Sequence, residues 1–108
     1  MGTFVKYKDK GGEWRFNLQT GNGDIKLNSE GYKSESGCDN GIESVRENSQ
    51  DENMYVGVTA TNGQLYFNLK APNGQIIGTS ELYRSASGRD RGKASVKKNA
   101  PKADVETR

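Results

Sequence analysis

The sequence contains no histidine, and this absence excludes several kinds of chemistry. Histidine is the general base of Ser-His-Asp and Cys-His catalysis and the usual nitrogen ligand of protein-bound zinc. The single cysteine, Cys38, can form neither an internal disulfide nor an all-thiolate metal site. We therefore expect a protein that is not an enzyme and that needs no metal or other cofactor.

Long apolar runs are absent as well. No stretch approaches the ~20 apolar residues of a transmembrane helix, and the first residues, MGTFVKYKDKGG, contain no apolar segment of a secretory signal. Apolar residues make up only 31% of the 108 residues, which is enough for one thin core but not for two. The composition predicts one soluble, cytoplasmic domain, residues 1–108, without membrane contact.

The chain repeats itself with an offset of 51 residues. The stretch NGDIKLNSEGYKS begins at Asn22 and NGQIIGTSELYRS begins at Asn73, and matching residues continue on both sides without a gap. Such self-similarity indicates the duplication of one supersecondary unit. We divide the domain into repeat one, residues 1–52, and repeat two, residues 53–108.

Each repeat predicts three strands followed by a helix. The segments EWRFNL and QLYFNL alternate apolar and polar residues with the period of a half-buried strand. The Asn-Gly pairs at residues 22–23 and 73–74 predict two-residue type I′ hairpin turns. The preceding strands are TFVKYK and MYVGVT, and the pattern leaves open whether Phe4 or Val5 points into the core.

The period changes after the third strand, which predicts a helix. Ser34 and Ser85 stand at the N-cap positions. Asn48 and Asn99 suit the ends of the helices, where left-handed geometry is tolerated. One helix face carries Cys38, Gly41, Ile42 and Val45.

Three positions in these helices raise separate expectations. Gly41 and its repeat partner Gly92 lie mid-helix at a cost of roughly 1 kcal/mol relative to alanine, which suggests a close approach of helix and sheet; a backbone contact to a ligand is the alternative. Cys38 aligns with Arg89, which predicts partial exposure of the thiol.

Two such units can bury their apolar faces against each other about a pseudo-twofold axis. The predicted fold is α+β, with one antiparallel sheet and both helices on one face of it. Because this pseudo-dimer is already covalent, we expect a monomer.

The segments KDKGGEWRFNL, NGIESVRENS, FNLKAPNGQIIGTSELY and ASVKKNAP together resemble the YegP-like family of small bacterial proteins. The resemblance implies tandem β3-α-β repeats in which the C-terminal strand of one repeat is swapped onto the other. ADVETR, residues 103–108, would be such a strand, and ENMYV, residues 52–56, would serve both as a swapped segment and as a first strand. The family has no established activity, so it implies no catalytic residues. The chain departs from the pattern at Lys93, which replaces the apolar residue matching Ile42 and predicts a less buried second helix.

Charge is distributed unequally between the repeats. Repeat one carries seven Lys/Arg and ten Asp/Glu, whereas repeat two carries nine and four. The excess gathers in RSASGRDRGKASVKK, on the predicted second helix, and makes this helix a candidate site for nucleic acid or another polyanion. The candidate residues are Arg84, Arg89, Arg91, Lys93, Lys97 and Lys98.

Three functions remain open at this point. The first is an uncharacterised YegP-like binding or structural domain, and the second is a polyanion-binding domain that contacts nucleic acid or an acidic protein surface. In the third, Glu30 and Glu81 approach across the pseudo-axis and act as a carboxylate pair. A solvated helix face and self-association of the acidic repeat with a basic one are the alternatives to ligand binding.

Overall fold

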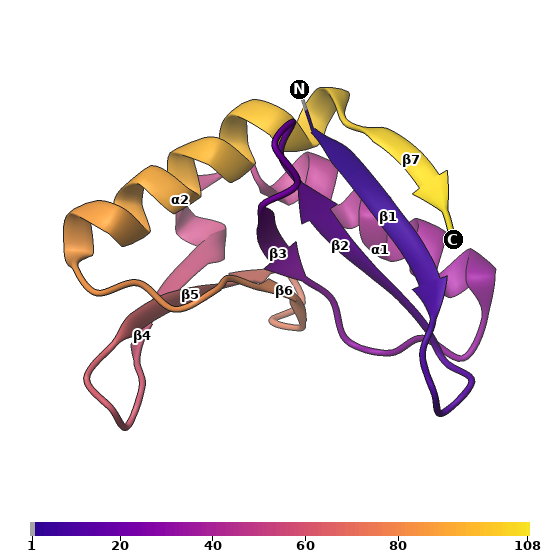
Figure 1. Ribbon diagram of the computed structural model, residues 1–108, viewed down its shortest axis with the longest axis horizontal. Helices are drawn as coiled ribbons and strands as arrows, with labels where there is room; N and C mark the ends of the chain where they lie inside the picture. Colours follow the sequence, from indigo (N-terminus) through magenta and orange to yellow (C-terminus); the bar gives the residue numbers. More distant parts are fainter. Residues whose placement is uncertain (1) are drawn as a thin grey trace.

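The computed structural model describes residues 2–108, which form seven strands and two α-helices (Figure 1). The elements follow the predicted order of three strands and a helix, twice, with a last strand at the end. They are β1 (Thr3–Lys8), β2 (Trp14–Gln19), β3 (Ile25–Asn28), α1 (Glu35–Asn48), the 3₁₀ turn η1 (Glu52–Met54), β4 (Tyr55–Thr59), β5 (Leu65–Lys70), β6 (Ile76–Thr79), α2 (Ala86–Asn99), the 3₁₀ turn η2 (Ala100–Lys102) and β7 (Asp104–Thr107). Within the described residues, neither helix is long and apolar enough to cross a membrane.

All seven strands form one sheet in the order β4-β5-β6-β3-β2-β1-β7. The two repeats meet at its centre, where β3 and β6 share the single pair Asn28 and Thr79. The pairs from β1 to β6 are antiparallel as predicted, whereas β7 runs parallel to β1. The C-terminal strand of repeat two therefore lies on repeat one, as the resemblance implied. The ENMYV segment forms η1 and then enters β4, which pairs with β5.

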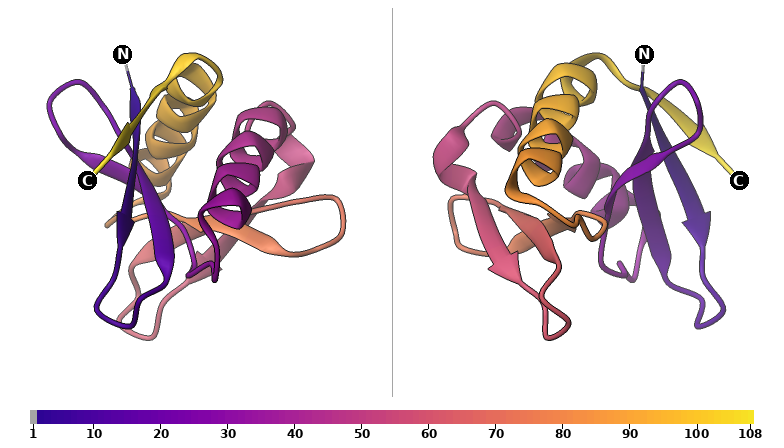
Figure 2. Two further views of the ribbon diagram at one scale, coloured as in Figure 1. Left: turned by 90° about the vertical axis from the view of Figure 1, so that its right-hand side faces the viewer. Right: turned by 60° about the vertical axis from the view of Figure 1, so that its left-hand side comes forward.

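Both helices lie on the concave side of the strongly bent sheet (Figure 2). Each helix contacts strands of both repeats, so the two units share one buried cluster. Phe4 is fully buried and packs edge-on against Phe16, with ring centroids 5.8 Å apart, while Val5 on the opposite pleat is also buried. The other members of the cluster are Leu18, Leu27, Cys38, Ile42, Val45, Tyr55, Phe67, Leu69, Ile77, Val96, Ala100 and Ala103.

The helices start after the predicted N-caps and end at Asn48 and Asn99, as predicted. The hydroxyls of Ser34 and Ser85 accept hydrogen bonds from first-turn amides, which satisfies donors that have no partner inside the helix. Neither asparagine uses the left-handed geometry that a helix end tolerates, because no non-glycine residue has positive φ among residues 2–108. Their side-chain amides donate to the carbonyl oxygens of Ser44 and Ser95, four residues back. The residues that follow, Ser49 and Ala100, keep the right-handed helical conformation.

The hairpin turns also differ from the type I′ prediction. Thr20 N–H donates to the Asp24 carbonyl and Gly23 N–H donates to the Thr20 carbonyl, which is the pattern of a three-residue turn. Only Gly23, at φ 87°, is left-handed, and Asn22 instead accepts the Asp24 amide with its side chain. The Asn-Gly pair predicted the position of the turn correctly, but it did not predict the length of the turn. The Asn side chain can accept a hydrogen bond from the backbone two residues later, which stabilises the longer turn.

The mid-helix glycines do mark a close approach. A Cβ on Gly41 would lie 2.4 Å from the Tyr32 hydroxyl oxygen and 3.1 Å from Phe16 Cε2. A Cβ on Gly92 would lie 2.1 Å from the Tyr83 hydroxyl oxygen. Each glycine thus makes room for the tyrosine that follows the third strand of its own repeat.

The expectation that Cys38 is partly exposed is wrong, because the thiol is fully buried. Burial raises its pKa to about 11, so the thiol is protonated at neutral pH. On the strand facing this part of α1, Lys6 is buried and binds Glu35 and Asp39 at 2.8 and 2.7 Å. In repeat two the sizes are exchanged, since Gly57 replaces Lys6 and Arg89 replaces Cys38.

Candidate polyanion-binding surface

The predicted basic residues lie on two different sides of α2. Arg84, just before the N-cap, Arg91 and Lys98 are all exposed. Arg91 and Lys98 are seven residues apart on α2, and two helical turns take about 7.2 residues, so these two residues lie on one line with a spacing of about 10 Å. Arg84 lies just beyond the N-terminal end of the same helix. We call these three residues the exposed row. Within residues 2–108, none of them lies within 4.0 Å of a carboxylate oxygen.

Lys93 and Lys97 face the opposite way, toward β4. Both ammonium groups bind the Glu52 carboxylate, Lys93 at 3.1 Å, and both lie over the Tyr55 ring. The hydrogen bond from Lys97, followed by that from Lys93, lowers the pKa of Glu52. Lys93 thus fills the place of Ile42 with its aliphatic stem and keeps its charge at the edge of the core.

Arg89 lies on this inner side too. Its Nη1 is 2.9 Å from the position of a Cβ on Gly57, so the guanidinium covers the space that a side chain on β4 would take. Its Nε is buried without a hydrogen-bond partner among the described residues. The six predicted residues therefore do not share one face, and only the exposed row is open to a large ligand.

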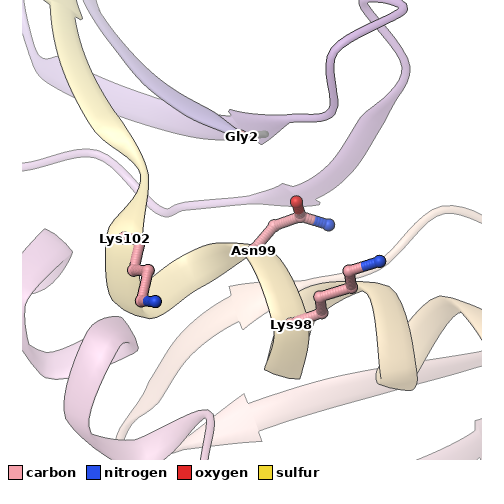
Figure 3. A pocket seen from close by; sticks show the side chains of 4 residues that line it. All are labelled: Gly2, Lys98, Asn99 and Lys102. Atoms are coloured by element: carbon pink, nitrogen blue, oxygen red, sulfur yellow. The ribbon is translucent and has the colours of Figure 1, made fainter.

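The exposed row ends at a hollow of about 390 Å³ between the end of α2 and the start of β1. Lys98, Asn99, Lys102 and Gly2 line it, and Figure 3 shows Lys98 and Lys102 on the two sides of Asn99. Lys102 was not among the predicted residues, because Pro101 disfavours continuation of a helix beyond Asn99. The 3₁₀ turn η2 carries the chain one turn further and places this second lysine beside the first.

The repeat supplies an internal comparison for this surface. The positions in repeat one that match Arg84, Arg91 and Lys98 hold Lys33, Asn40 and Glu47, and Asp51 matches Lys102. A second hollow, of about 200 Å³, lies between α1 and the β5–β6 turn and is lined by uncharged residues. The two helices take equivalent places in their repeats, but within residues 2–108 only α2 carries the exposed row.

The alternative catalytic pair has little support in the geometry. Glu30 and Glu81 are exposed, and neither carboxylate takes part in a hydrogen bond or ion pair within residues 2–108. No cluster of three or more cysteine and acidic side chains that could hold a metal ion occurs in the same residues. The row on α2 thus remains the best-defined candidate site.

Comparison with known proteins identifies the family. A family model described as a domain of unknown function, DUF1508, matches residues 9–55 and 60–106. The chain belongs to the DUF1508 family. Its two matches are offset by 51 residues, as the sequence repeat is, and the YegP relatives confirm the resemblance to YegP-like proteins.

Relatives in this family cover almost the whole chain. A UPF0339 protein from the ptx operon 5′ region of Stutzerimonas stutzeri is 50% identical over 104 residues, which are 96% of this chain and 94% of that protein. The UPF0339 protein YegP of Escherichia coli K12 is 47% identical over the same coverage. These DUF1508 relatives are uncharacterised proteins, and they indicate neither an enzymatic activity nor nucleic-acid binding.

Solved structures of DUF1508 relatives have the same fold. The solution NMR structure of YegP from E. coli, described as a protein of unknown function, matches with a TM-score of 0.93 at 46% identity, over 98% of this chain and 91% of that one. A UPF0339 protein of Shewanella oneidensis matches with a TM-score of 0.92 at 43% identity, over 98% and 90%.

Proposed function

We propose that this chain is a monomeric, cytoplasmic binding domain without catalytic activity, built as one domain (residues 1–108) from repeats 1–52 and 53–108. Its exposed row contacts the phosphate backbone of a nucleic acid. The observation that carries the proposal is the exposed row: Arg84, Arg91 and Lys98 are exposed, have no acidic partner within residues 2–108, and are not matched by three cations in repeat one.

The chemistry of the row favours the backbone over the bases. Sequence-tolerant single-strand platforms stack bases on aromatic side chains, and no aromatic residue belongs to the row. Three cations that each neutralise one phosphate give affinities that fall with salt by a logarithmic slope of about −2 to −3. The N-terminal end of the row adds to this attraction, because the first turn of α2 carries no acidic residue to offset the helix dipole.

An NMR titration of ¹⁵N-labelled protein with a short DNA duplex tests the proposal. We expect amide shifts in α2 around residues 84–98, and an affinity that falls about 20- to 40-fold when the salt concentration rises from about 50 to about 200 mM. Arg84→Glu should weaken binding, whereas Lys33→Glu, the same charge reversal at the matching position of repeat one, should have a much smaller effect.

The control decides between a site and a general effect of charge. Equal losses for Arg84→Glu and Lys33→Glu would show that only net charge matters, and the proposal would be wrong. An absence of shifts at low salt would also contradict it and would leave the row as a solvated helix face. Shifts with a polyglutamate probe but not with DNA would contradict nucleic-acid binding and would indicate that the exposed row binds acidic protein surfaces.

A further inference from the structure

The sheet has an open edge at β4. Five consecutive pairs, from Tyr55 with Leu69 to Thr59 with Leu65, join β4 to β5, and within residues 2–108 no strand lies on its other side. β4 therefore presents a row of backbone N–H and C=O groups at one side of the molecule, while β7 forms the opposite edge of the sheet (Figure 1).

The repeat shows how a strand fits on such an edge. β1 is the counterpart of β4, because Phe4 pairs with Leu18 as Tyr55 pairs with Leu69, 51 residues later. β7 lies parallel on β1, where Asp104 N–H donates to the Gly2 carbonyl at 3.2 Å and Arg108 N–H donates to the Lys6 carbonyl at 2.8 Å. The matching carbonyls on repeat two belong to Asn53 and Gly57. Gly57 lies within β4, so its carbonyl oxygen points toward the open edge, whereas Asn53 lies in the 3₁₀ turn η1 before the strand.

The open edge lacks the usual protection against strand addition. Natural edge strands carry charges, prolines or bulges that prevent pairing with another chain. β4 reads YVGVT, without charge or proline, and its register with β5 is unbroken. The opposite edge is different, since β7 carries Asp104 and Glu106 and is followed by Arg108.

The helix side of this edge is positively charged. Arg89 covers Gly57, and its Nε has no hydrogen-bond partner within residues 2–108. Side chains opposite each other on neighbouring strands are ~5 Å apart, so the residue opposite Gly57 on an added strand would lie beside the guanidinium. A carboxylate at that position can form a charge-assisted hydrogen bond with Arg89.

We propose that the outer edge of β4 binds an extended segment of another protein, which runs parallel to β4 and places an Asp or Glu opposite Gly57. Main-chain hydrogen bonds to the outer side of β4, the Gly57 carbonyl among them, hold the segment, and Arg89 selects its acidic residue. A second copy of this chain fits less well, because pairing of two β4 edges about a twofold axis brings two Arg89 guanidinium groups to the same seam. The site is separate from the exposed row, which lies on the other side of α2.

β7 provides the probe for a test. The peptide has the sequence of residues 100–108 with Thr107→Glu, because Thr107 faces Lys6 in the β7–β1 register and its counterpart would face Gly57. We expect titration into ¹⁵N-labelled protein to shift the amides of residues 53–59 and to slow their hydrogen exchange. A Thr107→Lys peptide should bind about tenfold more weakly, the effect of losing one hydrogen bond between charged groups.

Two variants and a modified peptide identify the contacts. Arg89→Gln should abolish the preference for the acidic peptide, while Arg91→Glu, in the exposed row of the same helix, should preserve it. A peptide N-methylated at the position of Arg108 loses the donor to the Gly57 carbonyl and should not bind β4. If Arg89→Gln impairs folding, the N-methylated peptide still tests the wild-type chain.

Other outcomes would overturn the inference. Shifts confined to residues 84–98 would mean that the peptide binds only by its charge, on the exposed row. Equal binding of the N-methylated peptide would exclude strand addition. Concentration-dependent broadening of residues 53–59 without peptide would show that a second copy covers the edge.

Discussion

At the scale of single residues, the glycines inside the helices give the clearest prediction. Gly41→Ala improves helix propensity by about 1 kcal/mol, but its Cβ would overlap the Tyr32 ring and press on Phe16. We expect a net loss of about 1–3 kcal/mol in the free energy of unfolding, the usual cost of an overpacked core. Urea unfolding measures it. The exposed neighbour Asn40→Ala should stay within about 0.5 kcal/mol of wild type, and equal stabilities of the two variants would refute the packing argument.

The error over Cys38 shows what a repeat alignment cannot predict. The alignment matches Cys38 with Arg89 and ignores their surroundings. Burial of each side chain depends on the strand residue that faces it. In repeat one the strand contributes the long side chain, Lys6, and the helix the small one; in repeat two Gly57 and Arg89 exchange these roles. Only the pairing of strand and helix shows that both arrangements fill similar space.

At the scale of elements, the sequence predicted where strands and helices lie better than how they end. Ser34 and Ser85 have a local signal, because a hydroxyl at the N-cap satisfies an amide three residues later. At helix ends and turns several backbone conformations are compatible with the same sequence. There the Asn side chains form hydrogen bonds that the sequence pattern did not predict, as Asn48 and Asn22 do. The parallel direction of β7 depends on contacts with repeat one, which are distant in sequence, and only the resemblance implied its swap.

The last strand gives a prediction at this scale. Its residues are exposed, so removal of residues 104–108 takes away edge hydrogen bonds worth about 0.5–1.5 kcal/mol each, largely offset by the entropy of ordering the strand. We expect residues 1–103 to lose about 1–2 kcal/mol of unfolding free energy, with faster hydrogen exchange in β1. Residues 1–99 should lose clearly more, because Ala100 and Ala103 are buried in the core. Equal losses in the two urea titrations would contradict this division.

At the scale of the whole molecule, the fold is nearly symmetric but its surface is not. The pseudo-twofold repeats the core and the N-caps, whereas the exposed row and the open edge each occur once. The sequence located the basic helix from its composition. It could not separate the row from Arg89, Lys93 and Lys97, because that division depends on which side of α2 faces β4.

The charge inventory of the molecule also predicts how stability depends on pH. Ion pairing with Arg15 lowers the pKa of Asp9, and bonds from Lys97 and Lys93 lower that of Glu52. Their contributions are present above the ordinary values of 3.8 and 4.5 and are lost as pH falls below them. Glu52 is exposed and Asp9 is only half-buried, so we expect a shallow acid limb. With no histidine to titrate, stability should be flat from about pH 6 to about pH 8.

The alkaline limb should be steeper, because the groups that titrate there are buried. Burial raises the pKa of Cys38 from 9.0 to about 11 and also raises that of Tyr55. The unfolded chain releases these protons first, so stability is complete below pH 9.0 and falls as pH rises toward the folded values. Urea midpoints measured across this range test the sign, and Cys38→Ala should move the onset toward 10.0, the ordinary value of tyrosine. An unchanged onset in that variant would show that the thiol does not drive the loss, and a rise in stability above pH 9.0 would contradict the burial of both groups.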